Sequence, residues 1–210
     1  MPEPLTPAAR FASIGRRIFH RRMHIGLFVV AAATLTIRPG NLFGRQPALG
    51  NALSLLLVLG GLALRAWAGG SAGSHTRKAS IEAPRLATGG PYAYVRNPIY
   101  LASIILGLGM VGLLGDPWML LPYIAVFVFL YTAIVPAEEE FLRGQFGDAY
   151  ARYYAHVPRA LPRLRPWSEA TAHPFDSSAL FGEARLALML LVIYVVMRGG
   201  AAVRMRYLGF

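Results

Sequence analysis

The chain contains no cysteine among its 210 residues. This absence excludes disulfide bonds, thiolate metal ligands and a cysteine nucleophile. Acidic residues are also scarce, with 10 aspartates and glutamates against 21 lysines and arginines. Charged residues make up only 15% of the chain, whereas 55% is hydrophobic, a balance too apolar for a typical soluble domain. The composition therefore favours a protein that lies in a lipid bilayer.

Metal and nucleic-acid partners are not expected. The five histidines are scattered along the chain, and no cluster of histidines and acidic residues suggests a metal site. The net charge of +11 would suit nucleic acid, but the basic residues gather at the ends of apolar segments, where anionic lipid headgroups attract them. The first 22 residues carry five arginines and show no cleavage site, so we expect no cleavable signal peptide.

Five apolar segments are long enough, or nearly so, to cross a membrane. Because a helical span needs about 20 residues, we predict an all-α, polytopic membrane bundle of about five transmembrane helices. The predicted segments are 23–37, 48–68, 98–115, 117–136 and 184–197.

The segments divide the chain into three parts. Residues 1–22 form a basic N-terminal segment, and residues 23–183 form a core with four spans and one surface helix. Residues 184–210 hold a C-terminal apolar helix, predicted as the fifth span.

The third and fourth segments are predicted to form a helical hairpin. Gly115-Asp116-Pro117 between them is typical of a tight turn. Pro136 is expected to kink the fourth helix, and residues 138–157 are predicted to form one amphipathic helix along the cytoplasmic surface. Its apolar and aromatic side would consist of Phe141, Leu142, Phe146, Tyr150, Tyr153, Tyr154 and Val157.

Orientation follows from the basic residues. If the N-terminus is cytoplasmic, sixteen of the 21 basic residues fall on the cytoplasmic side, as the positive-inside rule favours. Arg198, Arg204 and Arg206 would lie outside if the fifth segment crosses, against that rule. We therefore predict an integral protein of the cell inner membrane with a cytoplasmic N-terminus.

Two polar stretches at the edges of apolar segments are the candidate site. Residues 89–100 read GGPYAYVRNPIY and lead into the third segment, and residues 137–159 read AEEEFLRGQFGDAYARYYAHVPR and follow the fourth. An acidic triplet abutting an apolar span is costly unless it leaves the bilayer or has partners. Because the stretches bracket one hairpin, folding should bring them together on the cytoplasmic side.

The first stretch also shows local signals. Asn97-Pro98 fits the start of a helix, with asparagine as the N-cap and proline at the first helical position. Residues 88–91, Thr-Gly-Gly-Pro, predict a turn that lets backbone approach a ligand closely.

Together, residues 89–100 and 138–162 resemble the isoprenylcysteine carboxyl methyltransferase family. Its members are integral membrane enzymes that use S-adenosylmethionine and are related to phospholipid methyltransferases. The resemblance covers about residues 50–165 and is to the prokaryotic type. It implies a methyltransferase with a cytoplasmic cofactor pocket and a hydrophobic or lipid-linked methyl acceptor.

Carried over by position, the resemblance implies a cofactor site built from both stretches. Asn97, Pro98 and Tyr100 match the family's Arg-His-Pro-x-Tyr element, with Asn97 where many members carry histidine. Ile134 stands where the eukaryotic carboxyl methyltransferases carry an arginine that contacts substrate. The full set of predicted cofactor-binding residues is Leu86, Ala87, Tyr92, Arg96, Asn97, Pro98, Tyr100, Glu138 and Glu139.

These residue types suit the cofactor chemically. A carboxylate such as Glu138 can accept both hydroxyls of a ribose or pair with an ammonium, and tyrosine faces can contact adenine or a sulfonium. Arg96 and the helix amides after Asn97 suit the donor's carboxylate. Asn97 and Glu138 are the predicted positioning residues for the reaction. Arg143, Arg152 and Arg159 are predicted substrate contacts.

Three alternatives remain open from the sequence. The first is a phospholipid N-methyltransferase acting on a lipid amine. The second is a membrane sterol-type reductase, which shares a related helical architecture but binds NADPH. The third is a membrane scaffold without enzymatic activity.

Overall fold

The computed structural model describes residues 46–73 and 85–208. Within these ranges the chain is helical and contains no β-strand. The predicted first span, 23–37, and the basic segment 1–22 lie outside the described residues.

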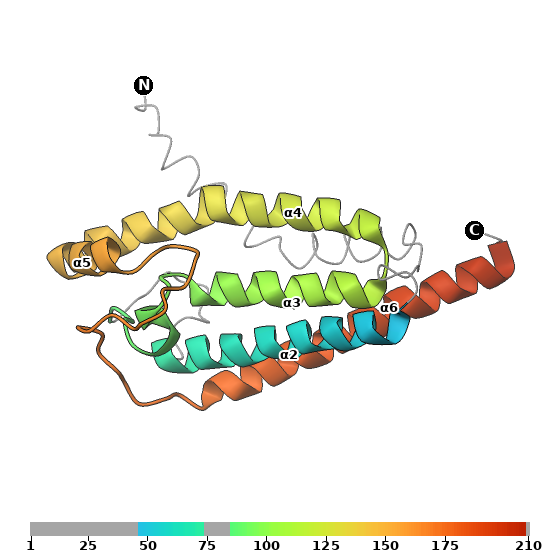
Figure 1. Ribbon diagram of the computed structural model, residues 1–210, viewed down its shortest axis with the longest axis horizontal. Helices are drawn as coiled ribbons and strands as arrows, with labels where there is room; N and C mark the ends of the chain where they lie inside the picture. Colours follow the sequence, from blue (N-terminus) through green and yellow to red (C-terminus); the bar gives the residue numbers. More distant parts are fainter. Residues whose placement is uncertain (1–45, 74–84, 209–210) are drawn as a thin grey trace, which may run out of the picture.

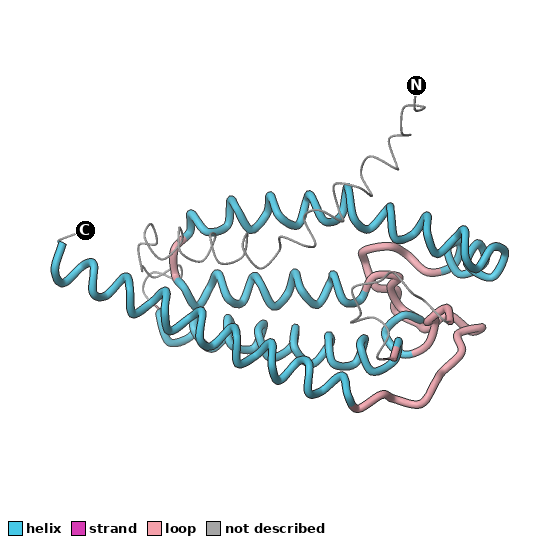
Figure 2. Tube along the Cα trace, turned by 180° about the vertical axis from the view of Figure 1, so that it is seen from behind, coloured by secondary structure: helices cyan, strands magenta, loops and turns pink. Residues whose placement is uncertain are grey.

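Helices run side by side along the long axis of the molecule (Figures 1 and 2). α2 spans Pro47–Ala72, α3 spans Pro98–Leu114 and α6 spans Ser178–Leu208. α4, Leu120–Phe129, continues through a π-helical turn into α5, Val135–His156. The two ends of the bundle differ. One carries the short connection between α3 and α4, and the other carries residues 85–97 and 157–177 (Figure 1).

Three of these elements are long and apolar enough to cross a membrane. They are α2, the continuous helical run Pro117–His156 and α6 over Ser178–Tyr207. α3 is apolar but shorter, with 17 residues. The predicted all-helical membrane architecture is thus confirmed for the described residues, while the number of five spans stays a prediction.

Small residues let α2 and α3 approach closely. A Cβ atom on Gly61 would lie 2.6 Å from Leu106 Cβ, and one on Gly109 would lie 2.6 Å from the Ser54 carbonyl oxygen. The Ser54 hydroxyl is buried at this contact and donates to the Gly50 carbonyl at 2.8 Å. Because lipid tails are as apolar as leucine, membrane helices associate partly through close van der Waals packing, which small residues permit.

The predicted hairpin turn is confirmed. α3 ends at Gly115, whose φ of 77° favours glycine. The Asp116 carboxylate accepts from the Trp118 backbone N–H at 3.0 Å and starts the next helix. Across the hairpin, the Tyr123 hydroxyl donates to the Ile104 carbonyl. The turn and this bond fix α3 beside α4.

Pro136 acts on the helix differently from the predicted kink. A proline removes one helical N–H and its ring crowds the carbonyl four residues earlier, here that of Thr132. The structure widens to a π-helical turn over Leu130–Ile134, immediately before Pro136, and the helix continues. The helical run therefore reaches from the membrane span to the polar stretch without a break at Pro136.

The single amphipathic helix predicted over 138–157 is wrong in one respect. Gly147 has φ 49° and ψ −123°, which interrupts α5 between two helical pieces. Phe141 and Tyr154 are exposed, whereas Tyr150, Tyr153 and Val157 are buried. The aromatic side of the second piece faces the protein, and the break at Gly147 lets it turn back over the polar end of the bundle.

α6 is longer than the predicted segment 184–197. It begins six residues earlier and includes Glu183, which pairs with Arg65 of α2 at 2.9 Å. Arg65 also donates to the Ser103 hydroxyl of α3 at 2.6 Å. A lone charge among apolar helices is costly. Because Arg65 pairs with Glu183 and also binds Ser103, α6 can begin before its apolar segment and include the charged Glu183.

Candidate active site

The two polar stretches meet at one end of the bundle, on the left in Figure 1. Residues 89–100 lead into the start of α3, and Glu138–Glu140 lie in the first turns of α5. The two stretches therefore come together, as predicted from their positions on either side of one hairpin.

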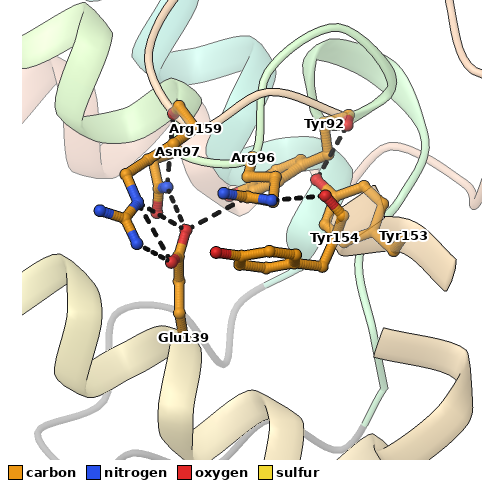
Figure 3. Close-up of polar contacts among 7 residues, drawn as sticks. All are labelled: Tyr92, Arg96, Asn97, Glu139, Tyr153, Tyr154 and Arg159. Carbon is orange, nitrogen blue, oxygen red and sulfur yellow. Dashed lines mark hydrogen bonds and ion pairs between the residues drawn. The ribbon is translucent and has the colours of Figure 1, made fainter. Parts of the chain in front are cut away.

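The Glu139 carboxylate is the centre of a hydrogen-bonded cluster (Figure 3). Arg159 reaches Glu139 Oε2 through Nη2 at 2.5 Å and through Nε at 3.1 Å. Arg96 Nε donates to Oε1 at 3.2 Å, and Asn97 Nδ2 does so at 3.4 Å. Glu139 is only 4% exposed, and the guanidinium groups of Arg96 and Arg159 compensate its buried charge. These contacts hold the carboxylate in place.

Arg96 joins the two stretches in three further ways. Its backbone N–H donates to the Pro158 carbonyl at 2.8 Å. Its Nη1 donates to the Tyr154 carbonyl at 2.6 Å, and its guanidinium carbon lies 3.8 Å from the centre of the Tyr154 ring. The predicted cofactor contact Arg96 is therefore engaged with α5 and the segment that follows it.

Asn97 occupies the N-cap position of α3, with Pro98 in the first turn, as predicted. The side-chain hydrogen bond that is typical of an N-cap asparagine does not form, since the Asn97 side chain donates instead to Glu139 and to the Arg159 carbonyl, at 3.4 Å from each. The first N–H groups of α3 therefore lack the side-chain partner that an N-cap usually supplies.

Glu138 has a different environment from its neighbour. The Tyr100 hydroxyl donates to Glu138 Oε1 at 2.8 Å, which links α5 to the first turn of α3. The negative charge of Glu138 also reaches Tyr92, whose pKa is raised chiefly by burial and further by that charge. Glu138, Tyr100 and Tyr92, three of the predicted cofactor residues, thus form one group.

The glycine turn packs against the chain itself. Gly90 has φ 58° and begins a 3₁₀-helix, Gly90–Ala93. A Cβ atom on Gly89 would lie 2.4 Å from the Thr171 carbonyl oxygen, and one on Gly90 would lie 2.3 Å from the Ser71 hydroxyl oxygen. The close backbone approach that the glycines permit here is to other parts of the protein.

Sequence reasoning did not predict that residues 158–171 run beside residues 88–96. The Arg163 N–H donates to the Tyr94 carbonyl at 3.0 Å, and the Trp167 N–H donates to the Ala93 carbonyl at 2.9 Å. The only signal in the sequence for this pairing is that residues 158–171 directly follow α5. Backbone pairing of this kind depends on no side-chain pattern.

An aromatic cluster closes this side of the site. Tyr150, Tyr153, Val157 and Trp167 are buried together, and Leu86 packs against them. The Tyr153 hydroxyl donates to the Tyr92 carbonyl at 2.9 Å. Trp167 is therefore a core residue, although its position in the sequence is also typical of an interfacial anchor.

The remaining predicted residues lie around this core. Ala87 is half-buried beside Leu86. Arg143 and Arg152 are exposed, and the Arg143 guanidinium carbon lies 5.0 Å from the centre of the Tyr154 ring. Arg159 is committed to Glu139, whose hydrogen bonds raise the pKa of its guanidinium. No group of three histidine, aspartate or glutamate side chains that could hold a metal ion occurs in the described part of the chain.

Residues 49–149 match the model of the phospholipid methyltransferase family. The chain is therefore similar to this family over just under half of its length. The family segment runs from the start of α2 to the break at Gly147, so it contains every predicted cofactor residue.

Curated relatives point the same way. A protein-S-isoprenylcysteine O-methyltransferase of Schizosaccharomyces pombe is 38% identical over 79 residues, which cover 38% of this chain and 34% of that protein. The Xenopus laevis protein of the same name is 29% identical over 117 residues, covering 54% of this chain and 41% of that protein. The cobalt-zinc-cadmium resistance protein CzcN of Cupriavidus metallidurans is 31% identical over 80 residues, covering 38% and 36%. The predicted resemblance is thereby confirmed, although the prokaryotic type stays a prediction.

These matches have a clear extent. They span well under half the length of the curated relatives. No solved structure matches the chain. The long apolar helices and the membrane-type methyltransferase family together indicate an integral membrane protein. The segment 158–171, which completes the site, lies beyond the family match.

Proposed function

We propose that the protein is an S-adenosylmethionine-dependent methyltransferase acting on a hydrophobic or lipid-linked acceptor at the cytoplasmic face of the cell inner membrane. The observation that carries this proposal is the convergence of Tyr92, Tyr100 and Glu138 at one end of the bundle. The match of residues 49–149 to the phospholipid methyltransferase family supports it.

The residues present fit such a cofactor. Glu138 Oε1 accepts a hydrogen bond from Tyr100, while Oε2 accepts none from the described residues and can bind a ligand hydroxyl or ammonium. The uncapped N–H groups at the start of α3 suit a carboxylate. Arg85 Nε is buried and has no partner among the described residues, and it precedes the predicted contacts Leu86 and Ala87. The site therefore contains a negatively charged hydrogen-bond acceptor, Glu138, and hydrogen-bond donors that include the positively charged Arg85.

The chain's contribution to the reaction is mainly positional. When bound, S-adenosylmethionine would supply a methyl group on a sulfonium for in-line transfer to the acceptor, with S-adenosylhomocysteine as the leaving group. Glu138, fixed by Tyr100, would orient the donor, and the cluster around Glu139 would keep the two stretches together. Holding both reactants in line can contribute several kcal/mol, about 7–11 in the best intramolecular cases.

The acceptor is the less determined partner. Ile134 lies in the π-helical turn and supplies no cation there for a carboxylate. Of the three predicted arginine contacts, Arg159 is occupied by Glu139, which leaves the exposed Arg143 and Arg152. We therefore expect weak methylation of a small farnesylcysteine analogue. This observation favours a second candidate function, methyl transfer to a lipid amine such as that of phosphatidylethanolamine.

Methyl transfer from radiolabelled S-adenosylmethionine tests the proposal. The purified full chain would be offered N-acetyl-S-farnesylcysteine, phosphatidylethanolamine and total membrane lipid in parallel. Label in any hydrophobic product supports a membrane methyltransferase. Label in phosphatidylethanolamine alone identifies the second candidate. Efficient transfer to the farnesylcysteine analogue that survives neutralising Arg143, Arg152 and Arg159 together would refute the expectation for the carboxylate.

A further inference from the structure

The helical run that follows the hairpin turn carries a buried hydroxyl group with no hydrogen-bond partner among the described residues. Three side-chain hydroxyls lie on the predicted span 117–136: those of Tyr123, Tyr131 and Thr132. Tyr123 donates to the Ile104 carbonyl, and Thr132 donates to the Val128 carbonyl at 2.6 Å. The Tyr131 hydroxyl is buried and has no hydrogen-bond partner among the described residues.

An unsatisfied hydroxyl here has a cost that phenylalanine would avoid. Leaving a buried polar group unpaired is destabilising, and an apolar span offers no water to replace the partner. Tyr131 lies five residues before Pro136, at the polar end of the span. The missing partner is therefore expected to be a molecule that binds at this depth.

Two observations place Tyr131 at the proposed site. Its ring meets the Tyr100 ring edge-on, with centroids 6.2 Å apart, and the Tyr100 hydroxyl donates to Glu138. Tyr131 and Glu138 therefore both face α3, and they are seven residues apart, roughly 10 Å along a helix. Tyr131 thus lies on the membrane side of the group that would hold the donor.

The helix is distorted at this residue. Tyr131 belongs to the π-helical turn Leu130–Ile134, and π-turns frequently occur at functional sites because they redirect side chains. Pro136 explains why the turn forms, and the turn contains Tyr131, whose ring packs against that of Tyr100 and whose hydroxyl has no partner among the described residues.

We propose that Tyr131 is a positioning residue for the methyl acceptor, with its hydroxyl hydrogen-bonded to the acceptor's polar group beside the Tyr100–Glu138 pair. This inference rests on the proposed function, because it assigns the acceptor side of the same site. A phenol can both donate and accept, so it serves either a carboxylate or an amine.

Tyr131→Phe tests the assignment, with Tyr123→Phe as the matched control. A neutral hydrogen bond contributes about 0.5–1.5 kcal/mol, so Tyr131→Phe should raise the acceptor KM roughly twofold to thirteenfold. The kcat and the KM for S-adenosylmethionine should stay unchanged. Its thermal midpoint without ligand should not fall, since no bond is lost. Tyr123→Phe loses a bond and should lower the midpoint without changing the acceptor KM.

The measurements use the full chain in nanodiscs, with N-acetyl-S-farnesylcysteine and phosphatidylethanolamine as acceptor probes and calorimetry with S-adenosylhomocysteine alongside. An unchanged acceptor KM in Tyr131→Phe overturns the proposal, and so does a lowered midpoint in the absence of ligand. A wild-type chain that binds S-adenosylhomocysteine but methylates neither probe also overturns it for acceptors of this kind. Failure to bind S-adenosylhomocysteine is a failure of the proposed function instead.

Discussion

Adjacent glutamates have different environments at this site. Glu139 is surrounded by donors from Arg96, Asn97 and Arg159, which makes it a structural centre. Glu138 has one donor, Tyr100, and keeps capacity for a ligand. The sequence predicted both as cofactor contacts because both belong to one motif. Neighbouring side chains on a helix point about 100° apart, so the two carboxylates meet different groups.

Glu138→Gln should weaken binding of S-adenosylhomocysteine. The substitution keeps the shape and removes the charge, and a charge-assisted hydrogen bond contributes about 1.5–3 kcal/mol. The dissociation constant should therefore rise roughly tenfold to a hundredfold with little change in the thermal midpoint. Titration calorimetry measures it, and Glu140→Gln, at an exposed position, is the control. An unchanged affinity would leave Glu138 as a simple helix-end carboxylate.

Glu139→Gln should act on stability instead. The change leaves Arg96 and Arg159 facing each other without a carboxylate between them. Breaking a fully buried ion pair costs about 3–5 kcal/mol, and the partial exposure of Arg159 reduces this to about 2–3 kcal/mol. Thermal unfolding followed by circular dichroism should show a lowered midpoint. A stable variant with weak cofactor binding would instead make Glu139 a ligand contact, as its motif position suggests.

At the scale of elements, glycines in α5 have opposite roles. Gly147 has φ 49° and ψ −123°, a conformation that L residues adopt only with strain, whereas Gly144 lies in regular helix with open space around its Cβ position. Gly147→Ala should destabilise the protein by about 1–3 kcal/mol, and Gly144→Ala should stabilise it by up to about 1 kcal/mol. Chemical denaturation of both variants measures the difference. Equal shifts in one direction would show that α5 is continuous through Gly147.

Much of this architecture could be predicted from periodicity and turn chemistry. The hairpin at Gly115 and the start of α3 at Pro98 follow from local signals, and both occur as predicted. The π-turn before Pro136 could not be predicted, because a proline permits either a kink or a widened turn. The backbone pairing of residues 93–96 with 158–167 could not be predicted from the sequence either, since it depends on how the folded chain brings the two segments together.

At the scale of the whole molecule, orientation decides which compartment supplies the donor. The polar end of the bundle should be cytoplasmic because most basic residues flank it. The absence of cysteine makes single-cysteine labelling clean. Glu140→Cys should react with a membrane-impermeant maleimide only in inside-out vesicles, and Trp118→Cys, at the hairpin turn, only in right-side-out vesicles. The reverse pattern would invert the proposed topology.

The most direct measurement is calorimetric titration of the purified full chain with S-adenosylhomocysteine and, separately, with NADPH. The convergence of Tyr92, Tyr100 and Glu138 predicts saturable binding of S-adenosylhomocysteine and none of NADPH. Binding should weaken in Glu138→Gln by the factor given above. Well-folded protein that binds no S-adenosylhomocysteine at millimolar concentration, or that binds NADPH instead, would contradict a methyltransferase.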